Sequence, residues 1–173
     1  MDIKEYVLKN GTIQKLVDGS KLTYEKVNGN VLLTIKSDYL PDGSTINDFT
    51  YAYNARTRLT EVTGMDGIKT AICWDINNYY PVVIGKNISY SNLSGALQSV
   101  NNVPNALYSQ PATQQAQLST FSYIPLVGLQ SKTDARGITT YYSYDGLGRL
   151  SEIYRMPNGV KQTIQSYQYH FKP

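Results

Sequence analysis

The feature that most constrains this chain is a twelve-residue segment that occurs twice. Residues 51–62 read YAYNARTRLTEV, and residues 142–153 read YSYDGLGRLSEI, with no gap in the alignment. Most differences are conservative, such as Asn54 against Asp145. The identical pairs are Tyr51/Tyr142, Tyr53/Tyr144, Arg58/Arg149, Leu59/Leu150 and Glu61/Glu152. Matching residues at matching spacing indicate an internal duplication, so the chain is predicted to be built from repeats.

Each copy has the pattern of a β-hairpin. Tyr142 and Tyr144 are two residues apart, which places both rings on one face of a strand. Asp145 and Gly148 supply turn chemistry, because Asp bonds the backbone ahead of it and Gly tolerates positive φ. An extended run follows as far as Gly159. Such hairpins cannot bury a face alone, so they are predicted to stack side by side into a sheet.

Further turn signals extend the pattern along the chain. Asn28-Gly29 lies between two extended runs, residues 22–27 and 30–35, and is a strong hairpin signal. Related glycine turns occur at Gly43, Gly67, Gly137 and Gly159. The long interval between the second and third turn indicates either three repeat periods or one period with an insertion. The predicted fold is mainly β: a curved antiparallel sheet of stacked hairpins with a short helical insertion.

The segment 85–120 interrupts the repeats. It is rich in Ser, Asn, Gln and Ala, and Leu93, Leu97 and Val100 follow helical spacing. A second short helix is predicted over residues 112–118, after Pro111. We therefore expect one domain, residues 1–173, with a polar helical excursion at 85–120 that is not part of the sheet. A disordered linker is the alternative.

Composition restricts the classes of function. The net charge of +3 lacks the dense positive charge typical of nucleic-acid binding, so no nucleic-acid partner is expected. One cysteine excludes an internal disulfide, and one histidine argues against a Cys/His zinc site. The chain shows no apolar run typical of a signal peptide or a membrane span. Its 16 tyrosines, against 3 phenylalanines, favour strands with one solvent-exposed face.

The second copy of the motif resembles the YD-repeat, or RHS-repeat, family of bacterial surface and secreted proteins. The family pattern is Tyr-x-Tyr-Asp-x-x-Gly-Arg-Leu, and residues 142–150 match every position of it. In the first copy Asn54 replaces Asp and Thr57 replaces Gly, so we expect a differently built turn there. Tyr167-Gln168-Tyr169 is similar to the first strand of a further repeat.

The resemblance implies an exported or cell-surface protein whose sheet forms part of a β-shell, which encloses a toxin in some members. Neighbouring repeats or another protein are the implied partners. The chain differs from full members because it is too short to close a shell and lacks their Asp-Pro-x-Gly signature. At the edges of the sheet, Lys172-Pro173 is expected to discourage further pairing.

The residues do not form a recognisable catalytic or metal-binding set. His170 lacks a nucleophile or carboxylate partner in sequence, and Cys73 lies in an apolar run typical of a buried core residue. Glu61 and Glu152 could act as a glycosidase pair, but their repeat positions beside Arg58 and Arg149 indicate a repeated inter-strand ion pair. We therefore predict no enzyme activity, no catalytic residues, no metal and no cofactor.

Two other patterns give weak signals. The segment from Asp75 begins like a calcium-binding loop but lacks the glycine and the closing glutamate. Tyr142 and Tyr144 could form a stacking platform for a glycan or a receptor, which is the alternative to a purely structural function. The remaining repeat-motif residues are assigned structural roles: Tyr51, Tyr53, Asn54, Arg58, Leu59, Glu61, Gly67, Gly137, Asp145, Gly148, Arg149, Leu150, Glu152 and Gly159.

Overall fold

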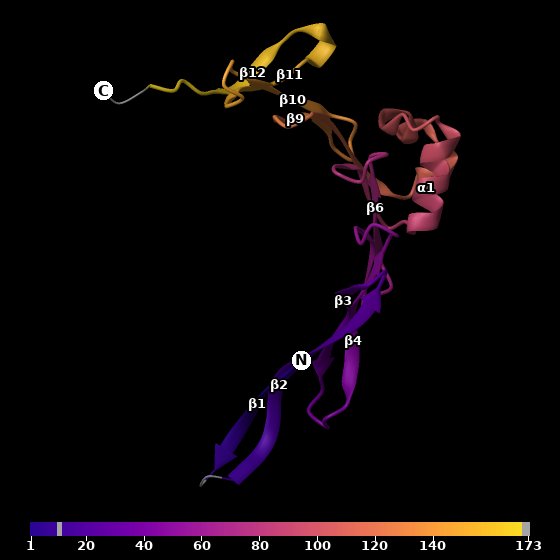
Figure 1. Cartoon of the computed structure of the whole chain (residues 1–173), viewed down its shortest axis with the longest axis vertical. Helices are drawn as coiled ribbons and strands as arrows, with labels where there is room; N and C mark the ends of the chain where they lie inside the picture. Colours follow the sequence, from indigo (N-terminus) through magenta and orange to yellow (C-terminus); the bar gives the residue numbers. More distant parts are fainter. Residues whose placement is uncertain (10–11, 171–173) are drawn as a thin grey trace. The chain divides into compact units, whose positions relative to one another are not determined.

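The computed structural model describes the backbone of residues 1–9 and 12–170, and the side chains outside residues 5–18, and it consists mainly of β-strands (Figure 1). Twelve strands form one sheet, and their order in the sheet is the same as their order in the sequence. Every strand pair with a defined register is antiparallel. The strands are β1 (Asp2–Lys9), β2 (Thr12–Val27), β3 (Asn30–Tyr39), β4 (Thr45–Tyr53), β5 (Leu59–Gly64), β6 (Lys69–Trp74), β7 (Pro81–Lys86), β8 (Gln117–Ile124), β9 (Gly128–Thr133), β10 (Thr139–Tyr144), β11 (Leu150–Arg155) and β12 (Gln162–Ser166). The mainly antiparallel β-fold predicted from the sequence is confirmed.

The described chain divides into two compact units. The first contains residues 1–72 and 86–90, and the second contains residues 73–85 and 91–173. One copy of the duplicated motif lies in each unit, at the β4–β5 hairpin in the first and the β10–β11 hairpin in the second. The two copies can therefore be compared hairpin by hairpin.

A one-residue bulge recurs in the hairpins, and in four of them a tyrosine lies beside it. In β4–β5, Ala52 pairs with Glu61 and Tyr53 with Leu59, which leaves Thr60 as the extra residue. The same arrangement pairs a tyrosine with a leucine in three other hairpins. These pairs are Tyr24–Leu33, Tyr123–Leu129 and Tyr144–Leu150. Because a bulge bends its strand and increases local twist, this repeated bulge is a built feature of the sheet.

The predicted hairpin at Asn28-Gly29 is confirmed. Val27 pairs with Asn30, so the loop has two residues. Asn28 has φ of 49° and Gly29 has φ of 85°, as a turn that matches the twist of the flanking strands requires.

The helical segment consists of α1 (Tyr90–Ser99) and two 3-10 helices, η1 (Pro104–Ser109) and η2 (Pro111–Thr113). A further 3-10 turn, η3 (Pro157–Gly159), follows β11. The helix expected at 112–118 is wrong beyond Thr113, because strand β8 already begins at Gln117. β8 then pairs with β9 along most of its length, and this pairing outweighs the local helical preference of a short alanine- and glutamine-rich run.

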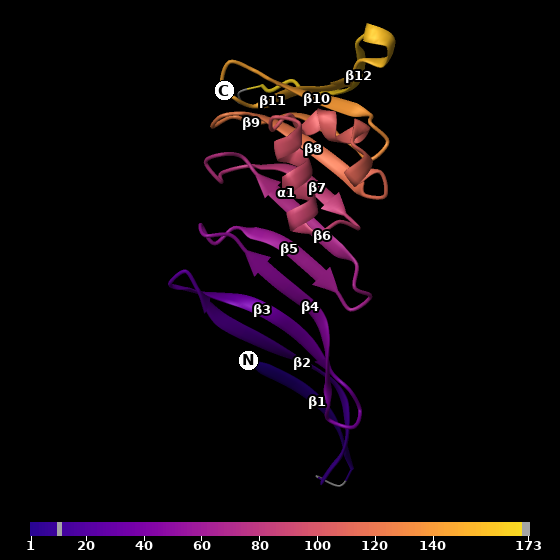
Figure 2. The ribbon, with the colours of Figure 1, turned by 90° about the vertical axis from the view of Figure 1, so that its right-hand side faces the viewer.

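The helices α1, η1 and η2 lie against one face of the sheet, over β7 and β8 (Figures 1 and 2). The largest fully buried side chains are Leu93 in α1, Leu107 in η1 and Val83 in β7. Ala96, Leu97 and Leu118 are also buried. The segment 85–120 was expected to lie outside the strand ladder, but its two ends belong to β7 and β8, and its buried side chains supply much of the core of the second unit.

Among the described residues, no helix combines the length and the apolar composition that crossing a membrane would require. The residues Lys172-Pro173, expected to blunt a sheet edge, lie outside the described residues.

Candidate functional site

The turn of the second motif copy is organised by the carboxylate of Asp145. Its Oδ1 accepts hydrogen bonds from the backbone N–H groups of Leu147 and Arg149, both at 2.9 Å. The guanidinium of Arg149 donates through Nε to Oδ2 at 2.8 Å, and its Nη2 also lies 2.8 Å from that oxygen. The hydrogen bonds from the backbone and side chain of Arg149 hold the pKa of Asp145 below its usual range. The motif Asp and Arg are therefore partners within one turn.

The first copy builds the same turn with different residues. Asn54 Oδ1 accepts from the N–H groups of Arg56 at 2.9 Å and Arg58 at 3.0 Å. Thr57 takes the place of Gly148, and its φ is 61° against 74° for the glycine. The expectation of a differently built turn is thus wrong: side-chain and backbone hydrogen bonds impose the left-handed conformation on a β-branched residue that disfavours it.

The second tyrosine of each motif links neighbouring strands. The Tyr53 hydroxyl donates to the carbonyl of Leu33 at 2.7 Å, and the Tyr144 hydroxyl donates to the carbonyl of Leu129 at 2.8 Å. Burial raises the pKa of both phenols. Tyr142 and Tyr144 are both half-buried. The Tyr144 hydroxyl is therefore engaged within the sheet.

Tyr169 repeats this interaction beyond the second copy. Its hydroxyl donates to the carbonyl of Leu150 at 2.9 Å, and the Arg149 guanidinium lies 4.4 Å from its ring centroid. The backbone N–H of Tyr167 donates to the Ser151 carbonyl at 2.9 Å. Residues 167–169 thus dock on the Arg-Leu of the preceding motif.

The paired glutamates form ion pairs with lysines at the start of the following strand: Lys69 opens β6, and Lys161 immediately precedes β12. Glu61 Oε1 lies 2.7 Å from Lys69 Nζ, and its Oε2 accepts from the N–H of Tyr90, the first residue of α1, at 2.7 Å. Glu152 Oε2 lies 2.5 Å from Lys161 Nζ, and its Oε1 accepts from Thr163 at 2.6 Å.

This arrangement corrects the expected partners of the glutamates. The repeated ion pair exists, but Lys69 and Lys161 form it, while Arg149 pairs with Asp145. In the first copy the reason is register: Glu61 pairs with Ala71, and Lys69 lies two residues from Ala71 on the same face of β6. Burial alone would raise the pKa of Glu61, but hydrogen bonds from Lys69 and Tyr90 outweigh it and lower that pKa. Both glutamates are engaged in structural contacts.

The remaining sequence candidates have structural positions. Cys73 is 4% exposed, and burial raises the pKa of its thiol to about 11, so it is protonated at neutral pH and a poor nucleophile. His170 is exposed beside the end of the described chain. Gly67, Gly137 and Gly159 all take positive φ in turns. Among the described residues, no group of three His, Cys, Asp or Glu side chains could hold a metal.

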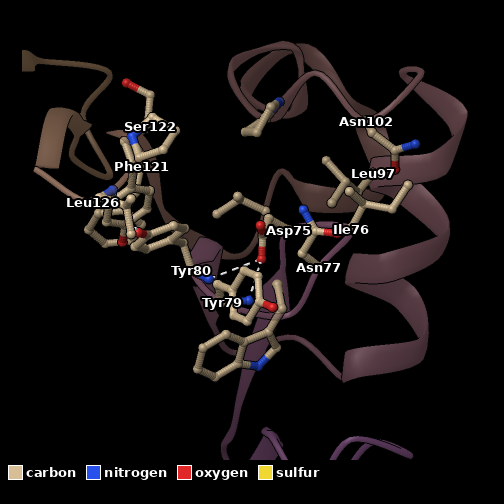
Figure 3. A pocket seen from close by; sticks show the side chains of 15 residues that line it. Asp75, Ile76, Asn77, Tyr79, Tyr80, Leu97, Asn102, Phe121, Ser122 and Leu126 are labelled. Atoms are coloured by element: carbon tan, nitrogen blue, oxygen red, sulfur yellow. Dashed lines mark hydrogen bonds between the residues drawn. The ribbon is translucent and has the colours of Figure 1, made fainter. Parts of the chain in front are cut away.

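A pocket of about 820 Å³ in the second unit was not foreseen from the sequence. Figure 3 shows Phe121, Ser122 and Leu126 on one side of it and Leu97 and Asn102 on the other, with Asp75 between them. Aromatic side chains form much of its lining. They are Trp74, Tyr79, Tyr80, Phe121 and Tyr123. The tyrosine-rich run after Trp74 was the available signal, but tyrosines are so frequent in this chain that it did not stand out.

The walls of this pocket are held by specific contacts. Tyr80 and Tyr123 stack with ring centroids 4.7 Å apart, and the Tyr80 hydroxyl accepts from the N–H of Leu126 at 3.3 Å. Asp75 Oδ1 accepts from the N–H groups of Tyr79 at 2.7 Å and Tyr80 at 3.0 Å. The calcium-like run from Asp75 therefore forms a turn that is closed by its own carboxylate and is one residue longer than the turn of Asp145, because the Asp75 N–H donates to the carbonyl of Tyr80 and the Asp145 N–H to that of Arg149.

Comparison with known proteins decides the family. The family model described as the teneurin YD-shell matches residues 26–170. The chain belongs to the teneurin YD-shell family. The YD/RHS resemblance of the motif is thereby confirmed. No curated protein gives a significant match.

Solved structures of large toxin complexes share the YD-shell fold of this chain. A TcdB2-TccC3-Cdc42 structure matches with a TM-score of 0.59 at 12% identity, over 97% of this chain and 8% of its own. TcdB2-TccC3 matches with a TM-score of 0.56 at 12% identity, over 84% of this chain and 7% of its own. A Tc holotoxin pore of Photorhabdus luminescens matches with a TM-score of 0.57 at 13% identity, over 97% and 8%. The YD-shell chain thus spans less than a tenth of the length of these structures.

Proposed function

We propose that this YD-shell chain is a non-enzymatic wall segment of an exported bacterial protein, and that its sheet continues into neighbouring repeats or another protein. The observation that carries the proposal is the docking of Tyr169 on Arg149 and Leu150. It repeats the hydrogen bond between Tyr144 and the carbonyl of Leu129 on the preceding strand, so the second motif copy offers the segment after β12 the same kind of contact. Membership of the YD-shell family and the likeness to toxin-complex shells support the same reading.

The exposed strand β12 supports continuation of the sheet. All five of its residues, Gln162–Ser166, are exposed, and β11 is its only neighbour in the strand order. It carries neither proline nor lysine, the residues that commonly blunt an edge. An edge of this kind can accept another strand through backbone hydrogen bonds.

Hydrogen exchange tests this proposal. The backbone amides of residues 162–170 should exchange at least tenfold more slowly in a version extended by one complete YD hairpin than in the chain alone. The amides of β4 and β5 serve as an internal control and should not change. Equal exchange in both proteins would contradict a continuing sheet.

The non-enzymatic part of the proposal has a separate test. The glutamates that could serve as acid and base are engaged by Lys69 and Lys161. Glycosides, peptides and phosphoesters should therefore show no turnover above that of a Glu61→Gln/Glu152→Gln double variant. A rate that this variant abolishes would overturn the proposal.

Glycan binding at Tyr142 and Tyr144 is less well supported than the structural role. Tyr144 uses its hydroxyl within the sheet, and both rings are half-buried. A glycan array should give no signal that Tyr142→Ala removes. Selective binding lost in that variant would restore the binding function.

A further inference from the structure

The pocket beside α1 has the size of a ligand site and a distinctive charge. Apart from the tyrosines and the indole N–H of Trp74, the polar side chains among the 15 lining residues are those of Asp75, Asn77, Asn102 and Ser122, and none of the 15 is Lys, Arg or His. The single formal charge in its lining is therefore negative. A volume of about 820 Å³ and a mostly apolar lining with a few fixed polar groups are typical of small-molecule sites.

The carboxylate of Asp75 is held in place with one oxygen to spare. Its Oδ1 accepts from two backbone N–H groups, and the backbone N–H of Asp75 donates to the Tyr80 carbonyl at 2.8 Å. Among the described residues, nothing donates a hydrogen bond to Oδ2. The turn therefore orients a charged oxygen in the pocket lining without supplying a cation for it (Figure 3).

The aromatic lining favours the same kind of ligand as the carboxylate. The face of a Tyr or Trp ring attracts a cation through its quadrupole. Elsewhere in this chain lysines occupy such faces: Lys4 Nζ lies 4.1 Å from the Tyr39 ring centroid and Lys161 Nζ lies 4.5 Å from that of Tyr154. Tyr79 is 67% exposed at the pocket and has no such partner among the described residues.

Two exposed apolar residues frame this site. Leu126 is 98% exposed and has φ of 61°, a conformation unfavourable for leucine, and Ile76 is 92% exposed. Strain and apolar exposure together at a turn are more typical of binding sites than of inert surface. The Phe121 ring of this aromatic lining has a lysine beside it, Lys132, whose Nζ lies 6.0 Å from the ring centroid. Lys132 is not among the residues that line the pocket, so it adds no positive charge to the lining.

We propose that this pocket binds a small organic cation, namely a substituted ammonium group carried on an apolar body. The ammonium group would lie against Asp75 Oδ2 and the Tyr79 ring, and the apolar body would contact Leu97, Phe121 and Leu126. Anionic ligands are disfavoured because the lining offers them no positive charge and one repelling carboxylate. Neutral apolar ligands would leave the carboxylate without a partner.

A pair of matched probes tests the charge requirement directly. Choline and its neutral isostere 3,3-dimethylbutan-1-ol have nearly the same shape and differ in charge. Trp74 is the single tryptophan of the chain and lines the pocket, so its fluorescence reports binding, and ligand-observed NMR gives an independent measure. Choline should bind at least fivefold more tightly than the alcohol. Equal affinities, or binding of neither probe, would overturn the proposal.

Two substitutions locate the site. Asp75→Asn removes the charge but keeps a side-chain oxygen that can accept from backbone N–H groups, as Asn54 Oδ1 does from Arg56 and Arg58 in its own turn. Asp75→Asn should weaken choline binding about fivefold, and Tyr79→Leu should weaken it two- to fivefold. Asp134→Asn makes the same substitution in another turn whose aspartate Oδ1 accepts from two backbone N–H groups; Asp134 does not line the pocket, and the variant is the matched control. Undiminished choline binding by a folded Asp75→Asn variant would refute the role of the carboxylate, and with it the proposal.

Discussion

The guanidinium of Arg149 lies 4.4 Å from the ring centroid of Tyr169 while it also pairs with Asp145. One motif residue thus fastens its own turn and receives the aromatic side chain that follows the hairpin. Because the Leu150 carbonyl accepts a hydrogen bond from the hydroxyl of the same tyrosine at 2.9 Å, Arg149 and Leu150 together bind the segment that follows β12.

Loss of the Arg149 contacts should lower the stability of the folded protein. Arg149→Ala should reduce the free energy of unfolding by about 1 kcal/mol, since it removes a partly exposed ion pair and a cation–π contact. Urea titration measures the change. Arg136→Ala is the matched control. The Arg136 side chain is 83% exposed, and its Nε lies 3.9 Å from the Asp134 carboxylate of an equivalent turn, so this ion pair is weaker than that of Arg149. Equal effects of the two substitutions would contradict the assigned role of Arg149.

The turn of the first copy should tolerate glycine better than threonine. Thr57→Gly should raise the free energy of unfolding by about 0.5–1 kcal/mol, because relief of the left-handed strain exceeds the added flexibility of the unfolded chain. Gly148→Val makes the reverse change and should cost about 1–3 kcal/mol. Chemical denaturation of both variants decides the matter, and a destabilised Thr57→Gly variant would show that the threonine hydroxyl outweighs the strain.

Gly128 is required by its contact with Tyr144. A Cβ at position 128 would lie 2.5 Å from the Tyr144 hydroxyl, which is itself held by Leu129. Gly128→Ala should therefore lower the free energy of unfolding by about 1–3 kcal/mol. The cost should be smaller in a Tyr144→Phe background, which removes the atom that clashes first. A thermodynamic cycle of the four proteins measures this coupling, and strict additivity would argue against the contact.

Glu61 should make stability depend on acid pH. Its pKa is lowered in the folded protein, so its contribution is complete above the ordinary value of about 4.5 and is lost as the pH falls through the folded pKa. Between about pH 5 and pH 3 the native protein should therefore lose more stability than Glu61→Gln. Urea titrations across this range test the difference.

A matched glutamate controls for general effects of acid. Glu25 is an exposed residue of β2, and Glu25→Gln is the matched control for the removal of one carboxylate. At neutral pH, Glu61→Gln should cost about 1 kcal/mol through the loss of the Lys69 ion pair and the weakened bond to Tyr90. A pH profile identical to that of the native protein would refute the lowered pKa.

Leu107 should be essential to the second unit. Leu107→Ala should cost about 2–5 kcal/mol, because the side chain is fully buried and its removal leaves a cavity. Val103→Ala is the matched control. Val103 is close to Leu107 in sequence and is 52% exposed, so this substitution should change stability little. Thermal and chemical unfolding compare the two, and a near-neutral Leu107→Ala would show that the helical segment is an excursion after all.

The sequence predicted the parts of the fold that depend on short-range chemistry. The alternation of Tyr142 and Tyr144, the two-residue loop at Asn28-Gly29 and the helical spacing of Leu93 and Leu97 were all sufficient, because strands, tight turns and helices are determined by residues a few positions apart. The same local information made the family recognisable from residues 142–150.

Tertiary structure decided what depends on register and on distant packing. The sequence could not show that Glu61 and Glu152 would pair with lysines instead of arginines, because cross-strand partners depend on the register with the following strand. The left-handed conformation of Thr57 is imposed by hydrogen bonds to Asn54, against its own preference. The pocket at Asp75 arises only because two turns and α1 converge, and such convergence depends on the packing of distant segments and not on any local pattern.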